Sequence, residues 1–282
     1  MKNFIIYSFI FIFIVLYLEI GIKVISAGLP YSYARDEKTQ MARTMNLPIN
    51  KFDPLQRTKP HFWFYALFSF YSFDYLLGRL TGEFYDKDDY IILYKSFPER
   101  IFFTGRLFSL ICGIAVLLIF IFWAKKYFNN FLLIFILYLL VLKDLYFYSV
   151  SSVLLADMFF VFLYILSTAT IYYSVLFKNK KYFFLSAALI GLTVSARQPG
   201  IFLFVPLLYG IITSLQENKI KIFFLCCLTA AFIFSITSPY YVLNFYNSFK
   251  GIILQFKNLS DTQEFSRLNI VNARGFSIVS YL

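Results

Sequence analysis

The chain has 282 residues, of which 60% are hydrophobic, and a formal net charge of +11 at pH 7. A soluble globular domain contains about 45–50% apolar residues, so the composition excludes an ordinary soluble protein and predicts that lipid covers part of the surface. The basic residues lie in small clusters between apolar runs. This pattern favours loops that face anionic lipid over a nucleic-acid-binding surface.

Apolar runs predict an all-α polytopic membrane protein, with seven transmembrane helices in a single membrane domain over residues 1–282. A helix needs about 20 residues to cross the hydrocarbon core. The first run is longer than a signal-peptide core, which favours an uncleaved span. The fifth and sixth runs are short, so they could be tilted helices, broken helices or a hairpin around Pro199 and Gly200. The predicted spans are 4–24, 101–123, 128–143, 151–177, 182–196, 200–215 and 221–238.

Lysine clusters predict the orientation of these helices. Seven spans put the loops after spans two, four and six on the same side as the N-terminus. Cytoplasmic loops are enriched in Lys and Arg, so we expect this side to be cytoplasmic in the plasma (inner) membrane. The long segment 26–100 then lies on the external side. The lysines concerned are Lys2, Lys125, Lys126, Lys178, Lys180, Lys181, Lys219 and Lys221.

The external segment 26–100 holds nine of the fifteen acidic residues and ten Lys and Arg. A connection this long is rarely structureless, so we expect helices within it. Residues 36–46 are predicted to form a short helix, because acids occupy the first turn and Arg43 lies near the end. Residues 60–77 are apolar and aromatic, which predicts one or two helices in the membrane interface, where Trp and Tyr are favoured.

Asp36 and Glu37 lie side by side at the start of the short helix. Acids are favoured there by the helix dipole alone, so a solvated helix start is one interpretation. The pair also follows the first span by about a dozen residues and can lie near the bilayer surface. There a carboxylate could deprotonate a hydroxyl or amine that meets a lipid-borne substrate. Both interpretations stay open at this point.

Several cations are expected near the same membrane surface. Arg57 and Lys59 precede the aromatic segment, where they could either reach toward headgroups or bind a phosphate. Arg106 and Arg197 fall near the external ends of predicted spans, as does Asp157. Ionisable groups at such depths usually face a protein interior or a watery cavity, so a structural Arg–Asp pair and a functional cavity are both compatible with them.

No metal site is predicted from ligand spacing. His61 is the only histidine, and Cys112, Cys226 and Cys227 fall in apolar runs without a metal-ligand pattern. Carboxylates could bind Mg²⁺ or Mn²⁺, although nothing in the sequence requires a divalent cation. The chain has no glycine-rich phosphate loop and no dinucleotide fingerprint, which argues against a nucleotide-dependent enzyme.

Six short motifs in chain order resemble the GT-C glycosyltransferases that use polyprenyl-phosphate sugars. The similarity is greatest to protein O-mannosyltransferases and to bacterial aminoarabinose transferases of lipid A. The motifs cover most of the chain, and each is weak by itself. They are Arg35-Asp36-Glu37, Lys59-Pro60-His61-Phe62-Trp63-Phe64-Tyr65, Arg106-Leu107, Leu155-Ala156-Asp157, GLTVSARQPG with Arg197, and Ser238-Pro239-Tyr240.

The resemblance implies an inverting glycosyltransferase that moves a sugar from a polyprenyl-phosphate donor to a lipid, glycan or protein acceptor. Asp36 would act as the general base, and Glu37 would assist in the acceptor or metal environment. The donor phosphate would be held by cations, and further residues would shape the cavity. The resemblance assigns the phosphate to Lys59, Arg106 and Arg197, and the cavity to Asp157, Arg57 and Tyr240.

The family commonly continues with further spans and an external domain, so the resemblance also implies that a C-terminal region is missing from this chain. An inactive core that binds a partner or lipid is therefore one alternative hypothesis. A membrane transporter or lipid flippase is another, because it would also explain charged groups and broken helices within the membrane. A transporter, however, has no need of an external acidic helix followed by a cationic interfacial helix.

Overall fold

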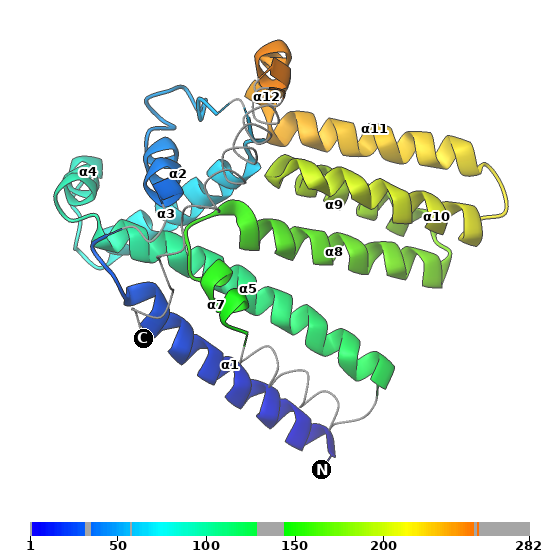
Figure 1. Cartoon of the computed structure of the whole chain (residues 1–282), viewed down its shortest axis with the longest axis horizontal. Helices are drawn as coiled ribbons and strands as arrows, with labels where there is room; N and C mark the ends of the chain where they lie inside the picture. The colour runs from blue at the N-terminus through cyan, green and yellow to red at the C-terminus, as the bar shows by residue number, and fades with distance from the viewer. Residues whose placement is uncertain (1, 32–34, 57, 129–143, 251–252, 254–282) are drawn as a thin grey trace, which may run out of the picture.

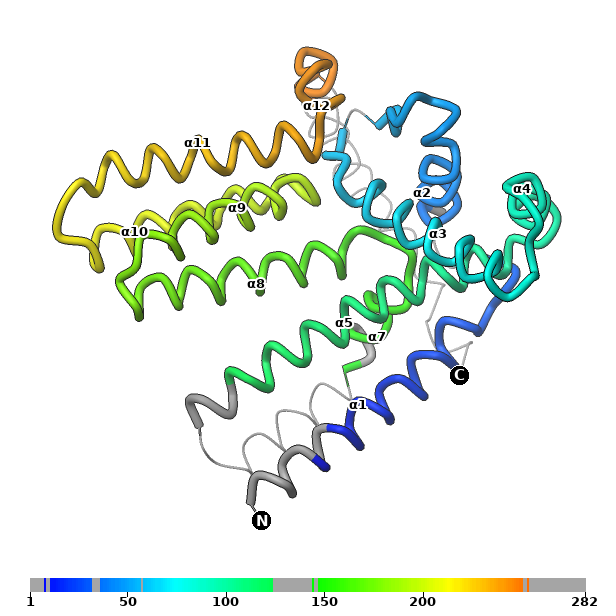
Figure 2. The backbone as a smooth tube through the Cα atoms, turned by 180° about the vertical axis from the view of Figure 1, so that it is seen from behind, coloured from blue at the N-terminus to red at the C-terminus, as the bar shows by residue number. Residues whose placement is uncertain are grey.

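A computed structural model of the chain describes residues 2–31, 35–56, 58–128, 144–250 and 253. Every regular element in these ranges is a helix, which confirms the all-α prediction. Figure 1 shows α8, α9, α10 and α11 stacked side by side, with α5 and α1 continuing the layer and α2, α3, α4 and α12 gathered at one end. The view from behind shows the same arrangement (Figure 2).

Most helices follow the apolar runs closely, because each run has few helix breakers and its polar flanks mark the ends. The helices of the first half are α1 (Lys2–Ser26), α2 (Arg35–Met45), α3 (Phe62–Leu80), α4 (Lys87–Ser96) and α5 (Glu99–Phe128). Those of the second half are α7 (Leu145–Ser151), α8 (Ala156–Phe177), α9 (Lys180–Ala196), the 3₁₀-helix η1 (Gln198–Leu203), α10 (Phe204–Ser214), α11 (Lys219–Thr237) and α12 (Pro239–Leu243).

Within the described residues, three helices are long and apolar enough to cross a membrane: Glu99–Trp123 of α5, Ala156–Phe177 and Lys219–Thr237. This is fewer than the seven predicted, so a membrane protein is supported and the number of crossings stays a prediction. The predicted third span, 128–143, lies almost wholly outside the described residues. The predicted span 151–177 is wrong at its start, because the chain turns after Ser151 and α8 begins only at Ala156.

The helix that best shows a membrane-facing surface is α11. Phe224, Leu228, Phe232 and Ile236 recur every four residues and are exposed along one stripe of it. Residues four apart share a helix face. An exposed apolar stripe of this length marks an interaction surface, and in this composition lipid is the natural partner. The opposite face of α11 packs against α9.

Small and hydroxyl-bearing residues hold α8, α9 and α11 together. A Cβ added at Gly191 would lie 2.6 Å from the carbonyl oxygen of Ala230, so only glycine permits this approach of α9 to α11. Hydroxyl groups pair across the helices between Ser167 and Thr193 at 2.9 Å and between Ser174 and Ser186 at 3.0 Å. Small residues and such hydrogen bonds are the usual means of joining helices in a membrane.

The basic clusters and α2 lie at opposite ends of the bundle (Figure 1). Lys178 follows α8, and Lys180 and Lys219 begin α9 and α11. The other ends of these three helices lie on the side of α2, α3 and α12. The helices therefore place the lysine loops that were used to predict the cytoplasmic side away from the acidic helix.

The segment between α1 and α5 folds into three helices, two of which were expected from the sequence. The predicted helix 36–46 corresponds to α2, and 60–77 corresponds to the single helix α3. The sequence did not lead us to expect α4. Asp86 is its N-cap residue and accepts hydrogen bonds from the backbone N–H groups of Asp88 and Asp89. Arg100 of α5 fixes α3 through Asp74, at 3.0 Å.

Candidate functional site

A fully buried ion pair lies behind the start of α2. Glu37 and Arg106 have no exposed side-chain surface. The Arg106 guanidinium donates to the carboxylate through both Nε–H and an Nη2–H, at 3.1 and 3.0 Å. Such a two-point contact suits the planar guanidinium group and fixes the angle between the two side chains. Glu37 also accepts a hydrogen bond from the Leu154 backbone N–H at 2.9 Å.

The remaining donors of Arg106 bind the chain where it leaves α1. They reach the backbone carbonyls of Ile25 at 2.9 Å, Tyr31 at 3.0 Å and Ala27 at 3.5 Å. The pair thus joins α1, α2, α5 and the turn before α8 at one point. A buried charge is tolerated only when it is paired and hydrogen-bonded, and Arg106 meets both conditions.

Asp36 lies next to Glu37 in the chain but in the opposite environment. Successive residues of an α-helix are rotated by about 100°, so the inward position of Glu37 turns Asp36 outward. Asp36 is exposed, and among the described residues its side chain has no hydrogen-bond or ion-pair partner. The sequence could not distinguish the two carboxylates, whereas the structure gives one a fixed internal partner and leaves the other accessible.

A second polar cluster forms where α8 begins and α9 ends. Asp157 and Arg197 make an ion pair, and about a third of each side chain is exposed. The next residue, Gln198, donates a hydrogen bond to the Thr58 carbonyl at 2.6 Å. This contact brings the loop that carries Lys59 to the Arg197 end of α9. Lys59 is half-buried and has no side-chain partner within the described ranges.

The loop before α3 is held by hydrogen bonds of its own, by one to the residue just after α11 and by one to α12. The His61 backbone N–H donates to the Ser238 hydroxyl at 3.0 Å, and its ring Nε2–H donates to the Gln56 carbonyl at 2.6 Å. The Tyr240 hydroxyl donates to the Lys51 carbonyl. Burial raises the pKa of the Tyr65 phenol, so it stays protonated and donates to the Phe52 carbonyl at 3.0 Å. The sole histidine and Tyr240 therefore shape this loop.

The structure brings most of the predicted site residues to one end of the bundle but in separate groups. Glu37 and Arg106 form the buried pair, while Asp157 and Arg197 form a partly exposed pair beside the Lys59 loop. A phosphate could reach Arg106 only by displacing the carboxylate and carbonyls that it binds. The phosphate roles of the three cations stay predictions, and Arg57 lies outside the described residues.

Two cavities open near α2, and neither is lined by Asp36, Lys59, Arg106 or Arg197. One of about 490 Å³ lies between α2, α3 and α4, and one of about 580 Å³ is lined by residues of α2 and the loop after it, including Lys38 and Arg43. Across the part of the chain that the structure describes, no three His, Cys, Asp or Glu side chains gather in a way that could hold a metal ion.

Comparison with known proteins gave no match to a family model, to a curated protein or to a solved structure.

Proposed function

We propose that this protein is an integral-membrane glycosyltransferase that moves a sugar from a polyprenyl-phosphate donor to a lipid, glycan or protein acceptor. The proposed topology has seven spans in the plasma membrane, a cytoplasmic N-terminus and the site on the external face. It is supported by the three long apolar helices and by the separation of the basic loops from α2.

The observation that carries the proposal is the contrast between two neighbouring carboxylates. Glu37 is locked to Arg106, while Asp36 is exposed and has no described partner. A general base needs an accessible carboxylate on a rigid support. The buried pair supplies the support, because it fixes the rotation of α2 and therefore the direction of Asp36.

The proposed reaction is a single inverting displacement. Asp36 accepts the proton of an acceptor hydroxyl or amine, whose heavy atom attacks the anomeric carbon of the donor sugar. The new bond forms as the bond between that carbon and the phosphate oxygen breaks, and the electron pair leaves with the polyprenyl phosphate. Lys59, with Arg197 nearby, stabilises the charge that develops on the leaving phosphate, which is the main electrostatic demand of such a step.

The decisive experiment is a transfer assay with purified protein, radiolabelled polyprenyl-phosphate sugars and candidate lipid, glycan and peptide acceptors. Asp36→Asn should lower turnover by about 10²–10⁴-fold, the usual contribution of a general base. Glu99→Gln is the matched control, because Glu99 is also an exposed acid in the first turn of a helix, and should keep near wild-type turnover.

The same assay tests the phosphate contact. Lys59→Gln should reduce transfer, whereas Lys51→Gln, an exposed cation of the same loop, should not. Equal turnover of Asp36→Asn and wild type would refute the general-base role. No turnover by a folded wild-type protein, together with movement of labelled lipid across vesicles, would replace the proposal with the lipid-transporter hypothesis.

A further inference from the structure

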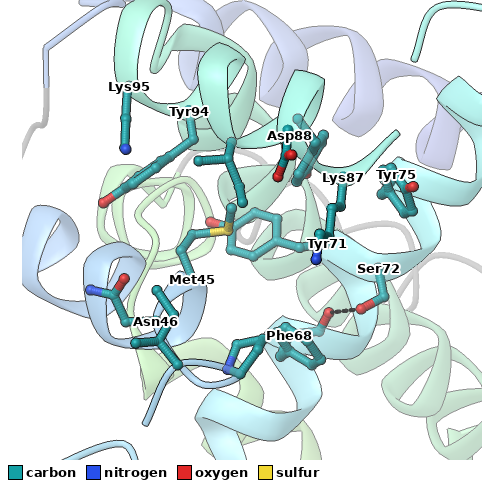
Figure 3. A pocket seen from close by; sticks show the side chains of 14 residues that line it. Met45, Asn46, Phe68, Tyr71, Ser72, Tyr75, Lys87, Asp88, Tyr94 and Lys95 are labelled. Atoms are coloured by element: carbon teal, nitrogen blue, oxygen red, sulfur yellow. Dashed lines mark hydrogen bonds between the residues drawn. The ribbon is translucent and has the colours of Figure 1, made fainter. Parts of the chain in front are cut away.

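The cavity between α2, α3 and α4 is lined mostly by apolar and aromatic side chains; Asn46 and Ser72 are its uncharged polar residues, and the Ser72 hydroxyl is hydrogen-bonded to the Phe68 carbonyl. Its volume of about 490 Å³ lies within the range of about 300–1,000 Å³ that is typical of small-molecule sites. Figure 3 shows Phe68, Tyr71 and Tyr75 of α3 on one side, Met45 from the end of α2, and Tyr94 of α4 opposite. Pro48, Ile49 and Ile91 complete the apolar lining.

Two of the four tyrosines that line the cavity donate their hydroxyl groups to other parts of the protein. The Tyr71 hydroxyl donates to the Ile101 carbonyl at 3.2 Å, and the Tyr90 hydroxyl donates to Asp74 at 3.1 Å. Burial raises the pKa of both phenols, so neither carries a charge near neutral pH. The inner wall therefore favours a hydrocarbon chain over a sugar, which would need many hydrogen bonds.

The charged side chains of the cavity are two lysines and one acid, which gives a net positive charge. Lys87 and Lys95 come from the two ends of α4, and Asp88 is the acid. Within the described residues, neither lysine amine has a hydrogen-bond or ion-pair partner. The nearby acids Asp86 and Asp89 instead accept hydrogen bonds from backbone N–H groups at the start of α4. The two amines are thus available to an anion.

The mouth of the cavity adjoins exposed apolar side chains. Ile49 and Ile91 line the cavity and are 77% and 39% exposed, and Ile92 beside them is 59% exposed. α3 also exposes Leu76 and Leu80. Apolar side chains next to free lysines are typical of a surface that lies in the headgroup region of a bilayer.

From the ring-lined wall, the unpaired lysines and the apolar mouth, we propose that this cavity holds one acyl chain of an anionic phospholipid, with its phosphate headgroup bound by Lys87 and Lys95. The apolar wall excludes free inorganic phosphate as the main ligand, and the positive charge favours an anionic over a zwitterionic headgroup. The site is separate from the residues of the proposed transfer reaction and does not depend on that reaction.

Photocrosslinking of the purified full chain in detergent tests this proposal. The probe is phosphatidylglycerol with a diazirine in one acyl chain, and labelled peptides are mapped by mass spectrometry. Label should concentrate in residues 45–49, 68–75 and 87–95. Unlabelled phosphatidylglycerol should compete for these sites, whereas diacylglycerol and phosphatidylcholine should compete at least several-fold less well and inorganic phosphate should not compete.

Two variants test separately how the charge of the lysines and the shape of the cavity contribute to lipid labelling. Lys87→Gln with Lys95→Gln should lower labelling of the cavity several-fold, while Lys180→Gln with Lys181→Gln, an equal charge change at the opposite end of the bundle, should leave it unchanged. Ile91→Trp should also lower it, because the larger ring occupies the mouth. Label found only on α5, α8 and α11, labelling indifferent to the cavity lysines, or equal competition by inorganic phosphate would each overturn the proposal.

Discussion

Replacing either member of the buried Glu37–Arg106 pair should destabilise the whole end of the bundle. Breaking a buried ion pair by removing one partner costs about 3–5 kcal/mol, because the other charge is left uncompensated. Glu37→Gln keeps the shape of the side chain and one acceptor oxygen for the Leu154 N–H. We therefore expect it to lower the free energy of unfolding by about 3 kcal/mol, the lower end of this range. Arg106→Met also removes the N–H groups that donate hydrogen bonds to three backbone carbonyls. We therefore expect it to lower the free energy of unfolding by about 5 kcal/mol or more, the upper end of this range.

The assay is equilibrium unfolding in mixed detergent micelles, followed by circular dichroism and by proteolysis of the α1–α2 connection. The double variant Glu37→Gln with Arg106→Met should lose less stability than the sum of these two single variants, because neither charge is then left unpaired. Asp36→Asn is the control and should change the unfolding free energy by less than about 0.5 kcal/mol, as is usual for exposed sites. A Glu37→Gln protein as stable as wild type would refute the structural role of the pair.

Two further predictions concern helix contacts away from this pair. Gly191→Ala should destabilise the protein by about 1–3 kcal/mol, because its Cβ would overlap the backbone oxygen of Ala230; Ala231→Leu on the exposed side of α11 should cost less in the same unfolding assay. Arg100→Met should loosen the connection between α3 and α4 at a cost of about 1–2 kcal/mol, between the values for exposed and buried pairs, because Arg100 binds Asp74 and Glu83; faster proteolysis within residues 81–86 would show this, and an unchanged rate would contradict it.

The sequence predicted the helices and the residues at which they begin and end wherever polar residues bound an apolar run. Residues 221–238 became α11 and 182–196 became α9 within a few residues, because lipid and protein interiors both select continuous apolar helices. The break between Ser151 and Ala156 gave no such signal. Residues 152–155 (Ser-Val-Leu-Leu) include neither proline nor glycine, and the turn is stabilised partly by the bond from the Leu154 N–H to Glu37, 117 residues away.

The sequence singled out the charged residues that the structure pairs at this end of the bundle, but it did not predict which of them pair. The motifs marked Glu37, Arg106, Asp157 and Arg197, and an Arg–Asp pair was one expected outcome. Which acid meets which cation depends on how helices far apart in the chain pack, as the 69-residue separation of Glu37 and Arg106 illustrates. Local sequence therefore could not reveal that Glu37 is internal while its neighbour Asp36 faces outward.

The opposite environments of Asp36 and Glu37 make the start of α2 sensitive to a shift in helix register as well as to a change of side chain. An inserted or deleted residue inside α2, between Glu37 and the buried Gln40, would rotate the helix start by about 100° relative to the rest of α2. It would carry a different residue toward Arg106 and leave both carboxylates in the chain but out of place. The spacing between Glu37 and the later buried residues of α2, Gln40 and Thr44, is thus as important to the ion pair as the carboxylate itself.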